Sequence, residues 1–161
     1  MLAGLRDEAD RIIETSTYNV HKLRSTILAI AAEGKKEIPL RINIFSFGFK
    51  HGAPRNADLV MDVRFLPNPY FEPELKAFSG EDPSVRDFIF KDPRTSRFMD
   101  KYLNLLDYLV PLYEKEGKAY LTIAFGCTGG RHRSVVVARA VYDHMQKHGH
   151  PIGINHRDIG R

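Results

Sequence analysis

The sequence is poor in cysteine and has no long apolar run. Cys127 is the only cysteine among 161 residues, which rules out an internal disulfide and favours a reducing compartment, so we expect a cytoplasmic protein. No apolar run approaches the roughly 20 residues needed to cross a bilayer. The first residues also lack the basic, apolar and small-residue pattern of a secretory signal. We therefore expect neither a membrane span nor a disulfide scaffold.

The glycine-rich motifs of nucleotide-hydrolysing proteins are also missing. The sequence contains neither the G-x-x-x-x-G-K-[ST] pattern of a P-loop nor the G-x-G-x-x-G pattern of a dinucleotide site. We therefore expect no NTP-hydrolysing machinery within these residues.

The composition is that of one soluble globular domain, with 43% hydrophobic and 27% charged residues. A net charge of +4 and a pI near 9.2 suit an anionic partner, although excesses of this size are common in proteins that bind no polymer. The positive charges gather at residues 50–64, 131–133 and 148–161. The positions of these charges say more about a binding site than the net charge does.

Alternating or continuous apolar residues predict four strands, at 40–49, 58–66, 119–126 and 151–156. Helical spacing predicts helices at 5–33 (interrupted at 15–19), 85–90, 95–116 and 132–147. Four prolines make 67–84 an ordered loop. Helices between buried strands predict an α/β fold, a layered sheet with parallel pairs flanked by helices.

The stretch "AFGCTGGRHRSVVVARAV", residues 124–141, runs from the strongest strand through a glycine turn into a helix. Such a junction places unpaired backbone N–H groups and the positive end of a helix dipole around one point, which suits phosphate. Gly129 and Gly130 allow close approach of the backbone. The other candidate ligands offer hydroxyl groups or positive charge: Thr128, Arg131, His132, Arg133 and Ser134. The alternative is a tight turn whose basic residues face solvent.

The same stretch matches the C-x5-R-[ST] arrangement of cysteine-dependent phosphatases through Cys127, Arg133 and Ser134. In that reading Arg133 holds phosphate, and Ser134 stabilises the thiolate as a leaving group. A general acid is also needed, for which the candidates are Asp62, Asp82 and Asp92. His132 stands where that motif usually has glycine, and the sequence leaves open whether Cys127 points into the loop or into the core.

Other polar residues have simpler interpretations. Asp62 and Arg64 alternate with apolar neighbours, which predicts an ion pair first and a pocket wall second. Asn68, held between two prolines, could hydrogen-bond a sugar hydroxyl. We expect no metal site, because the histidines at 144, 148 and 150 straddle a helix end without cysteines or carboxylates to complete a set. Core packing explains most of a further group of aromatic residues: Phe45, Phe47, Phe49, Tyr70 and Phe71.

Three segments, at 14–24, 46–71 and 120–138, together resemble the C-terminal domain of the RapZ family of bacterial RNase adapter proteins, also described as nucleotide-binding proteins. The motifs "FGFKHG", "DVRFLPNP" and "GCTGG-basic-HRS" occur in order at matching spacing. The resemblance implies an α/β domain similar to a phosphofructokinase subdomain. It also implies a pocket for glucosamine-6-phosphate and, as in enteric members, binding of small regulatory RNA.

Carried onto this chain, the resemblance implies a phosphosugar pocket of His51, Thr128, Gly129 and Arg133, with Gly130, His132 and Ser134 completing it. Full-length members begin with a kinase-like domain that has a true P-loop. We therefore expect 1–38 to be a helical lead-in to such a domain and 39–161 to be the phosphosugar-binding domain. ATP or GTP binding is assigned only to the absent domain, and the tail "INHRDIGR" is less basic than the RNA-binding tail of enteric members.

The resulting interpretation is a sensor or adapter domain, not an enzyme, that binds an amino-sugar phosphate and regulates amino-sugar synthesis through small RNA, a ribonuclease or a signalling protein. It needs no cofactor, and its pocket should accept phosphate or sulfate. The amphipathic segments at 5–33 and 95–116 suit a homo-oligomer. The alternatives are the cysteine-dependent phosphatase and a pure oligomerisation module.

Overall fold

The computed structural model describes residues 9, 11–32 and 39–161. The chain divides into two units, 1–38 and 39–161. In the first unit the helix α2 spans Val20–Ala32, and the Asn19 side chain accepts a hydrogen bond from the Lys22 N–H at 2.8 Å. Of the helix predicted over 5–33, residues 11–19 are not helical, and 5–8, 10 and 33 lie outside the described residues.

The second unit contains a four-stranded, all-parallel sheet. Its strands are β1 (Arg41–Gly48), β2 (Leu59–Asp62), β3 (Tyr120–Cys127) and β4 (Ile152–His156), in the order β2-β3-β1-β4. The four predicted strands are confirmed, and so is the α/β class. β2 ends earlier than predicted, at Asp62, because the Asp62 side chain accepts the Arg64 N–H at 2.9 Å and turns the chain.

Three helices complete this unit: α3 (Pro83–Phe90), α4 (Pro93–Lys115) and α5 (Arg133–Met145). Asp82 and Asp92 cap α3 and α4, each accepting a backbone N–H at 2.9 Å. Both helices begin with proline, which lacks an N–H that the first turn would leave unpaired, so they start two residues earlier than predicted. The caps explain why two of the three nominated acids stand where they do: they end loops rather than line a site.

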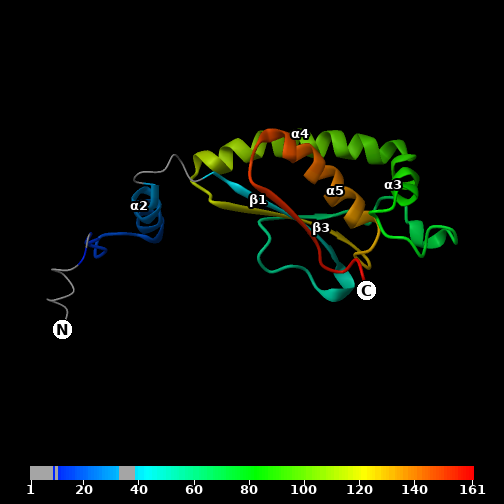
Figure 1. Cartoon of the computed structure of the whole chain (residues 1–161), viewed down its shortest axis with the longest axis horizontal. Helices are drawn as coiled ribbons and strands as arrows, with labels where there is room; N and C mark the ends of the chain where they lie inside the picture. Colours follow the sequence, from blue (N-terminus) through cyan, green and yellow to red (C-terminus); the bar gives the residue numbers. More distant parts are fainter. Residues whose placement is uncertain (1–8, 10, 33–38) are drawn as a thin grey trace. The chain divides into compact units, whose positions relative to one another are not determined.

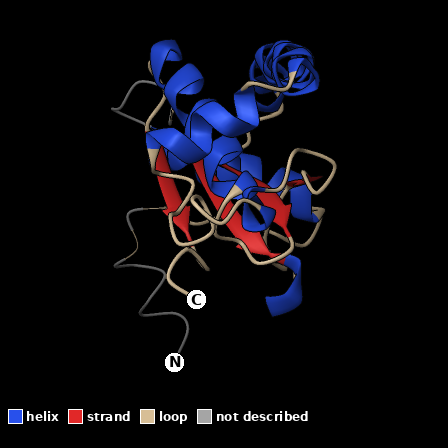
Figure 2. Ribbon diagram, turned by 90° about the vertical axis from the view of Figure 1, so that its right-hand side faces the viewer, coloured by secondary structure: helices blue, strands red, loops and turns tan. Residues whose placement is uncertain are grey.

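Helices α4 and α5 lie on the same face of the sheet (Figures 1 and 2). The buried side chains Ile42, Ile44 and Ile123 point to that face, and the Tyr102 ring of α4 meets the Phe125 ring of β3 edge-on at 5.5 Å. Within the described residues, no helix is both long enough and apolar enough to span a membrane. Since all four strands are parallel, the loops that follow them meet at one edge of the sheet, which we call the carboxyl edge.

Candidate functional site

A cavity of about 530 Å³ lies at the carboxyl edge. Its lining comes from the segments that follow all four strands: Lys50 after β1, Asn68, Tyr70, Phe71 and Lys76 after β2, Cys127, Thr128, Gly129, Arg131, His132 and Arg133 at the end of β3 and beyond it, and Arg161 after β4. We call it the carboxyl-edge cavity. Ligand sites in open parallel sheets occur at this edge, so its position alone makes it the first candidate.

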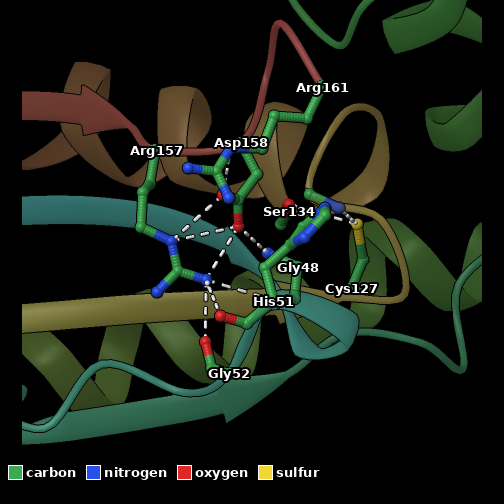
Figure 3. Close-up of polar contacts among 9 residues, drawn as sticks. Gly48, His51, Gly52, Cys127, Ser134, Arg157, Asp158 and Arg161 are labelled. Atoms are coloured by element: carbon green, nitrogen blue, oxygen red, sulfur yellow. Dashed lines mark hydrogen bonds and ion pairs between the residues drawn. The ribbon is translucent and has the colours of Figure 1, made fainter.

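The segment 127–133, which we call the β3–α5 loop, curls around the Cys127 thiol. Cys127 Sγ accepts the Gly130 N–H at 3.2 Å and lies 3.2 Å from Ser134 Oγ (Figure 3). The orientation that the sequence left open is thereby settled, since the thiol points into the loop and lines the cavity. α5 begins at Arg133, so the unpaired N–H groups of its first turn lie at the end of this loop.

Two glycines let the β3–α5 loop lie directly against the end of β1. A Cβ on Gly48 would lie 2.5 Å from the Gly129 carbonyl carbon, and a Cβ on Gly130 would lie 2.6 Å from the Gly48 nitrogen. Gly130 also has φ of +83°, a conformation that favours glycine. The Lys50 N–H donates to the Thr128 carbonyl at 3.2 Å, which joins the two loops further.

The fully buried Asp158 carboxylate holds the end of β1 where it packs against the β3–α5 loop (Figure 3). Asp158 Oδ2 accepts the Gly48 N–H at 2.8 Å and a hydrogen bond from Arg157 Nη2 at 2.8 Å, while Arg161 Nε lies 3.6 Å from Oδ1. Burial by itself raises the pKa of this carboxyl, but the hydrogen bonds from Arg157 and Gly48 and the charges of Arg157 and His51 outweigh it and hold the pKa below its usual range. Asp158 therefore stays ionised at neutral pH.

Arg133 is buried, with 6% of its surface exposed, and its guanidinium is only partly satisfied. Nη1 donates to the Arg64 and Leu66 carbonyls at 2.6 and 3.3 Å, and Nη2 donates to Thr128 Oγ1 at 3.3 Å. Arg133 Nε is buried and has no hydrogen-bond partner. Burial is the main reason that the pKa of this guanidinium falls below its usual value. A buried N–H donor without an acceptor is uncommon and calls for a ligand or water.

The neighbours of Arg133 have different environments. Arg131 donates to the carbonyls of Ala77, Phe78 and Ile159 at 2.7, 3.4 and 3.1 Å, so it ties the β3–α5 loop to the loop before α3 and to the tail. His132 is 8% exposed, and its Nε2 has no partner. Burial is the main cause that lowers the pKa of His132. Hydrogen bonding to the backbone of Lys76 and Phe78 opposes this shift and the two flanking arginines add to it, and the ring stays neutral near pH 7.

These contacts correct one point of the sequence interpretation. The alternative in which the basic residues face solvent is wrong for His132 and Arg133, because both are buried. Backbone carbonyls accept five hydrogen bonds from the guanidinium groups of Arg131 and Arg133, so part of the positive charge in the loop is already compensated without an anion. Arg133 Nε and His132 Nε2 remain without a partner.

Five of the predicted site residues do not line the carboxyl-edge cavity. Gly130 and Ser134 stabilise the β3–α5 loop without lining the cavity, since Gly130 packs against Gly48 and Ser134 contacts Cys127. Asp62 and Arg64 form the predicted ion pair at 2.6 Å, and Asp62 has a lowered pKa chiefly because Arg64 hydrogen-bonds to it. His51 lies in the turn after β1, with its Nε2 buried and without a partner.

Sequence reasoning missed five residues of the lining: Lys50, Tyr70, Phe71, Lys76 and Arg161. The core-packing interpretation, made for most of the five aromatic residues, does not extend to Tyr70 and Phe71, which are 51% and 76% exposed. The prolines at 67, 69 and 73 were the available signal, because a rigid loop can hold aromatic rings at the surface. The lining carries five cationic residues, and among the described residues that form it none is acidic.

The fold and the cavity define an α/β domain with a cationic cavity at the carboxyl edge of a parallel sheet. The chain belongs to the RapZ C-terminal domain family, whose model matches residues 40–160. The predicted resemblance is thus confirmed, and it covers nearly the whole of the second unit.

Curated relatives extend the likeness to the full chain. A protein named nucleotide-binding protein from Desulforapulum autotrophicum is 52% identical over 162 residues, which cover all of this chain and 55% of that protein. Proteins of the same name from Geotalea daltonii and Geobacter sp. are 49% and 46% identical, over 98% and 99% of this chain and 55% and 56% of their own lengths. The chain therefore spans about half the length of the curated relatives that it matches.

Proposed function

We propose that residues 39–161 form a ligand-sensing, non-catalytic domain that binds a phosphorylated sugar in the carboxyl-edge cavity. The observation that carries the proposal is the buried Arg133, whose Nε has no partner, in the wall of a cavity whose described lining is cationic and lacks carboxylates. A phosphate oxygen supplies the acceptor that Nε lacks. A doubly charged phosphate also offsets the lining charge of Lys50, Lys76 and the arginines.

The phosphate binds at the β3–α5 loop in this proposal. Backbone N–H groups at the start of α5 and the helix dipole favour an anion there, beside Arg133 Nε and Thr128. The neutral His132 ring, whose Nε2 has no partner, adds either a donor or an acceptor. The β3–α5 loop thus offers several donors that converge on one small anion.

The sugar then lies against Asn68 and the rings of Tyr70 and Phe71, which come from the segment after β2. Aromatic rings suit the apolar face of a sugar, and the Asn68 amide suits its hydroxyls. A cavity of about 530 Å³ is of the size that binds small ligands. The family resemblance makes glucosamine-6-phosphate the first ligand to test, and the name of the relatives extends the set to nucleotides, which share the phosphate group.

Calorimetry with four compounds tests this assignment: glucosamine-6-phosphate, glucose-6-phosphate, unphosphorylated glucosamine and ATP. We expect both sugar phosphates to bind at one site. Glucosamine should bind at least tenfold more weakly, because most hydrogen-bond donors of the proposed site bind the phosphate. Equal affinity for glucosamine and its phosphate would contradict the proposal. Failure of all four would favour the oligomerisation module, which needs no ligand.

Sensing requires that the ligand bind two states of the domain with different affinity. We propose that the bound sugar phosphate changes how the domain engages small regulatory RNA or a protein partner, and so regulates amino-sugar synthesis. The exposed cations Lys50, Lys76 and Arg161 of the lining are the candidates for contact with RNA phosphates. RNA binding of this kind weakens steeply with added salt, because bound counterions are released; an affinity independent of salt speaks against it.

A cysteine-dependent phosphatase is the second candidate, because Cys127 Sγ accepts the Gly130 N–H and lies beside Ser134 Oγ inside the loop. Such a reaction also needs an acid for the leaving group, and the described lining offers no carboxyl. We therefore expect no turnover of p-nitrophenyl phosphate above that of a Cys127→Ser variant. Turnover that the serine variant loses would establish the enzyme and overturn the sensor.

A further inference from the structure

A second cluster of polar side chains lies away from the carboxyl-edge cavity, between α4 and the end of α5. It consists of Asp107 from α4, His144 from α5 and His148 from the 3-10 turn η3 (Gln146–His148) that follows α5. Each residue offers one ligand atom, and the three atoms lie within 4.8 Å of one another. Neither the family match nor the proposed function gives this cluster a role.

The two imidazoles converge on a single carboxylate oxygen. His144 Nε2 lies 2.7 Å from Asp107 Oδ1, and His148 Nε2 lies 3.3 Å from the same atom. The histidines are four residues apart, so they project from the same side of the helix end, with ring centroids 5.2 Å apart. Two histidines at this spacing on one helix are a common half of a zinc site.

The sequence interpretation expected no metal because no carboxylate stood near the histidines. Asp107 supplies that carboxylate from another helix, 37 residues before His144. Two imidazoles and one carboxylate form a ligand set typical of zinc sites that keep a position open for water. From this cluster we propose that Asp107, His144 and His148 bind Zn²⁺ and thereby tie α4 to the end of α5.

The ligand atoms lie near the spacing that the ion requires. Tetrahedral zinc with bonds of about 2.0 to 2.2 Å holds its ligand atoms roughly 3.3 to 3.5 Å apart. The separation of 3.3 Å from His148 to Asp107 already fits, and the 2.7 Å separation from His144 must widen as the ion replaces the hydrogen bond. The two imidazole nitrogens lie within 4.8 Å of each other and take up the tetrahedral spacing when the ion binds.

Solvent reaches the cluster, as an open coordination position requires. The side chains of Asp107, His144 and His148 are 34%, 27% and 40% exposed. His144 also lines an open groove of about 320 Å³ that α3, α4 and α5 share, and two acidic and two basic side chains of this groove balance in charge: Asp100, Asp143, Arg86 and Lys147. The ion therefore has a path of entry, and water can complete its coordination.

Zinc titration of the untagged, EDTA-treated full chain tests the proposal by calorimetry and by the visible spectrum of Co²⁺ as a substitute. We expect one saturable equivalent of Zn²⁺, a tetrahedral Co²⁺ spectrum, and a melting temperature raised by roughly 5 to 10 °C at zinc about 100 times Kd. His148→Ala and Asp107→Asn should each weaken binding by more than tenfold.

His150 provides a matched control, because it follows η3 and its Nδ1 lies 3.3 Å from Oε1 of Glu114 in α4, outside the cluster. His150→Ala should change zinc affinity less than twofold. Absence of a saturable equivalent overturns the proposal, and so does equal loss from the His148 and His150 variants. Unliganded melting temperatures of the variants separate misfolding from lost ligation. Binding of sugar phosphate does not depend on this site, so the two proposals fail independently.

Discussion

Arg133→Lys lowers the affinity for sugar phosphate by more than tenfold on this account, and Arg133→Ala lowers it at least as far. Lysine keeps the positive charge but has one compact ammonium in place of a planar fork. In the proposed complex the guanidinium reaches the Arg64 carbonyl, Thr128 and a phosphate oxygen from three separate nitrogens, whereas the three N–H groups of an ammonium share one nitrogen and cannot span the same acceptors. Calorimetry with glucosamine-6-phosphate measures the loss.

Arg139→Lys is the matched control for this change. Arg139 lies in the same helix, but its guanidinium pairs with Glu81 at 3.1 Å in a half-exposed ion pair and does not line the cavity. Its replacement should leave the affinity within twofold. Because Arg133 also bonds backbone carbonyls, thermal unfolding of each unliganded variant must accompany the titration. An Arg133→Lys protein that unfolds normally and binds normally would remove Arg133 from the site.

Gly130→Ala should destabilise the domain by roughly 2 to 4 kcal/mol, because two separate costs fall on one residue. The φ of +83° is strained for any residue with a Cβ. The added Cβ would also lie 2.6 Å from the Gly48 nitrogen and 2.7 Å from the Asp158 Cβ, so β1 and the tail must move apart. Denaturant unfolding followed by circular dichroism measures the change.

Gly129→Ala tests whether these costs are specific to Gly130. A Cβ on Gly129 meets only the end of the flexible Lys50 side chain, at 3.9 Å, and the φ of Gly129 is not positive. We expect a loss below about 1 kcal/mol for this neighbouring substitution in the same loop. Equal losses at the two positions would contradict the close packing of β1 against the β3–α5 loop.

Local patterns were sufficient to predict the architecture. The strands at β1 and β3 alternate or are continuously apolar, and α5 follows β3 after a glycine turn, so the strand–loop–helix unit can be read from one stretch of sequence. The helix start at Pro83 was missed by two residues because this proline was assigned to the loop 67–84 rather than to the first position of a helix. The start at Pro93 was missed by the same margin, because the apolar spacing begins only after it.

The site was less predictable because its contacts join distant parts of the chain. The carbonyls that hold Arg133 belong to Arg64 and Leu66, 69 and 67 residues earlier, and no local pattern indicates them. The buried Asp158, 110 residues after Gly48, was not singled out for the same reason. Tyr70 and Phe71 were grouped by residue type with aromatic residues of the core, whereas the proline-rich loop holds them at the surface.

A crystal structure of the domain soaked in sulfate or tungstate tests the central claim most directly, because the phosphate subsite accepts any small oxyanion. We expect the ion at the start of α5, with one oxygen within hydrogen-bond distance of Arg133 Nε and others facing the amides of the β3–α5 loop. An ion bound only elsewhere on the surface, with Arg133 Nε still without an acceptor at saturating concentration, would contradict the account.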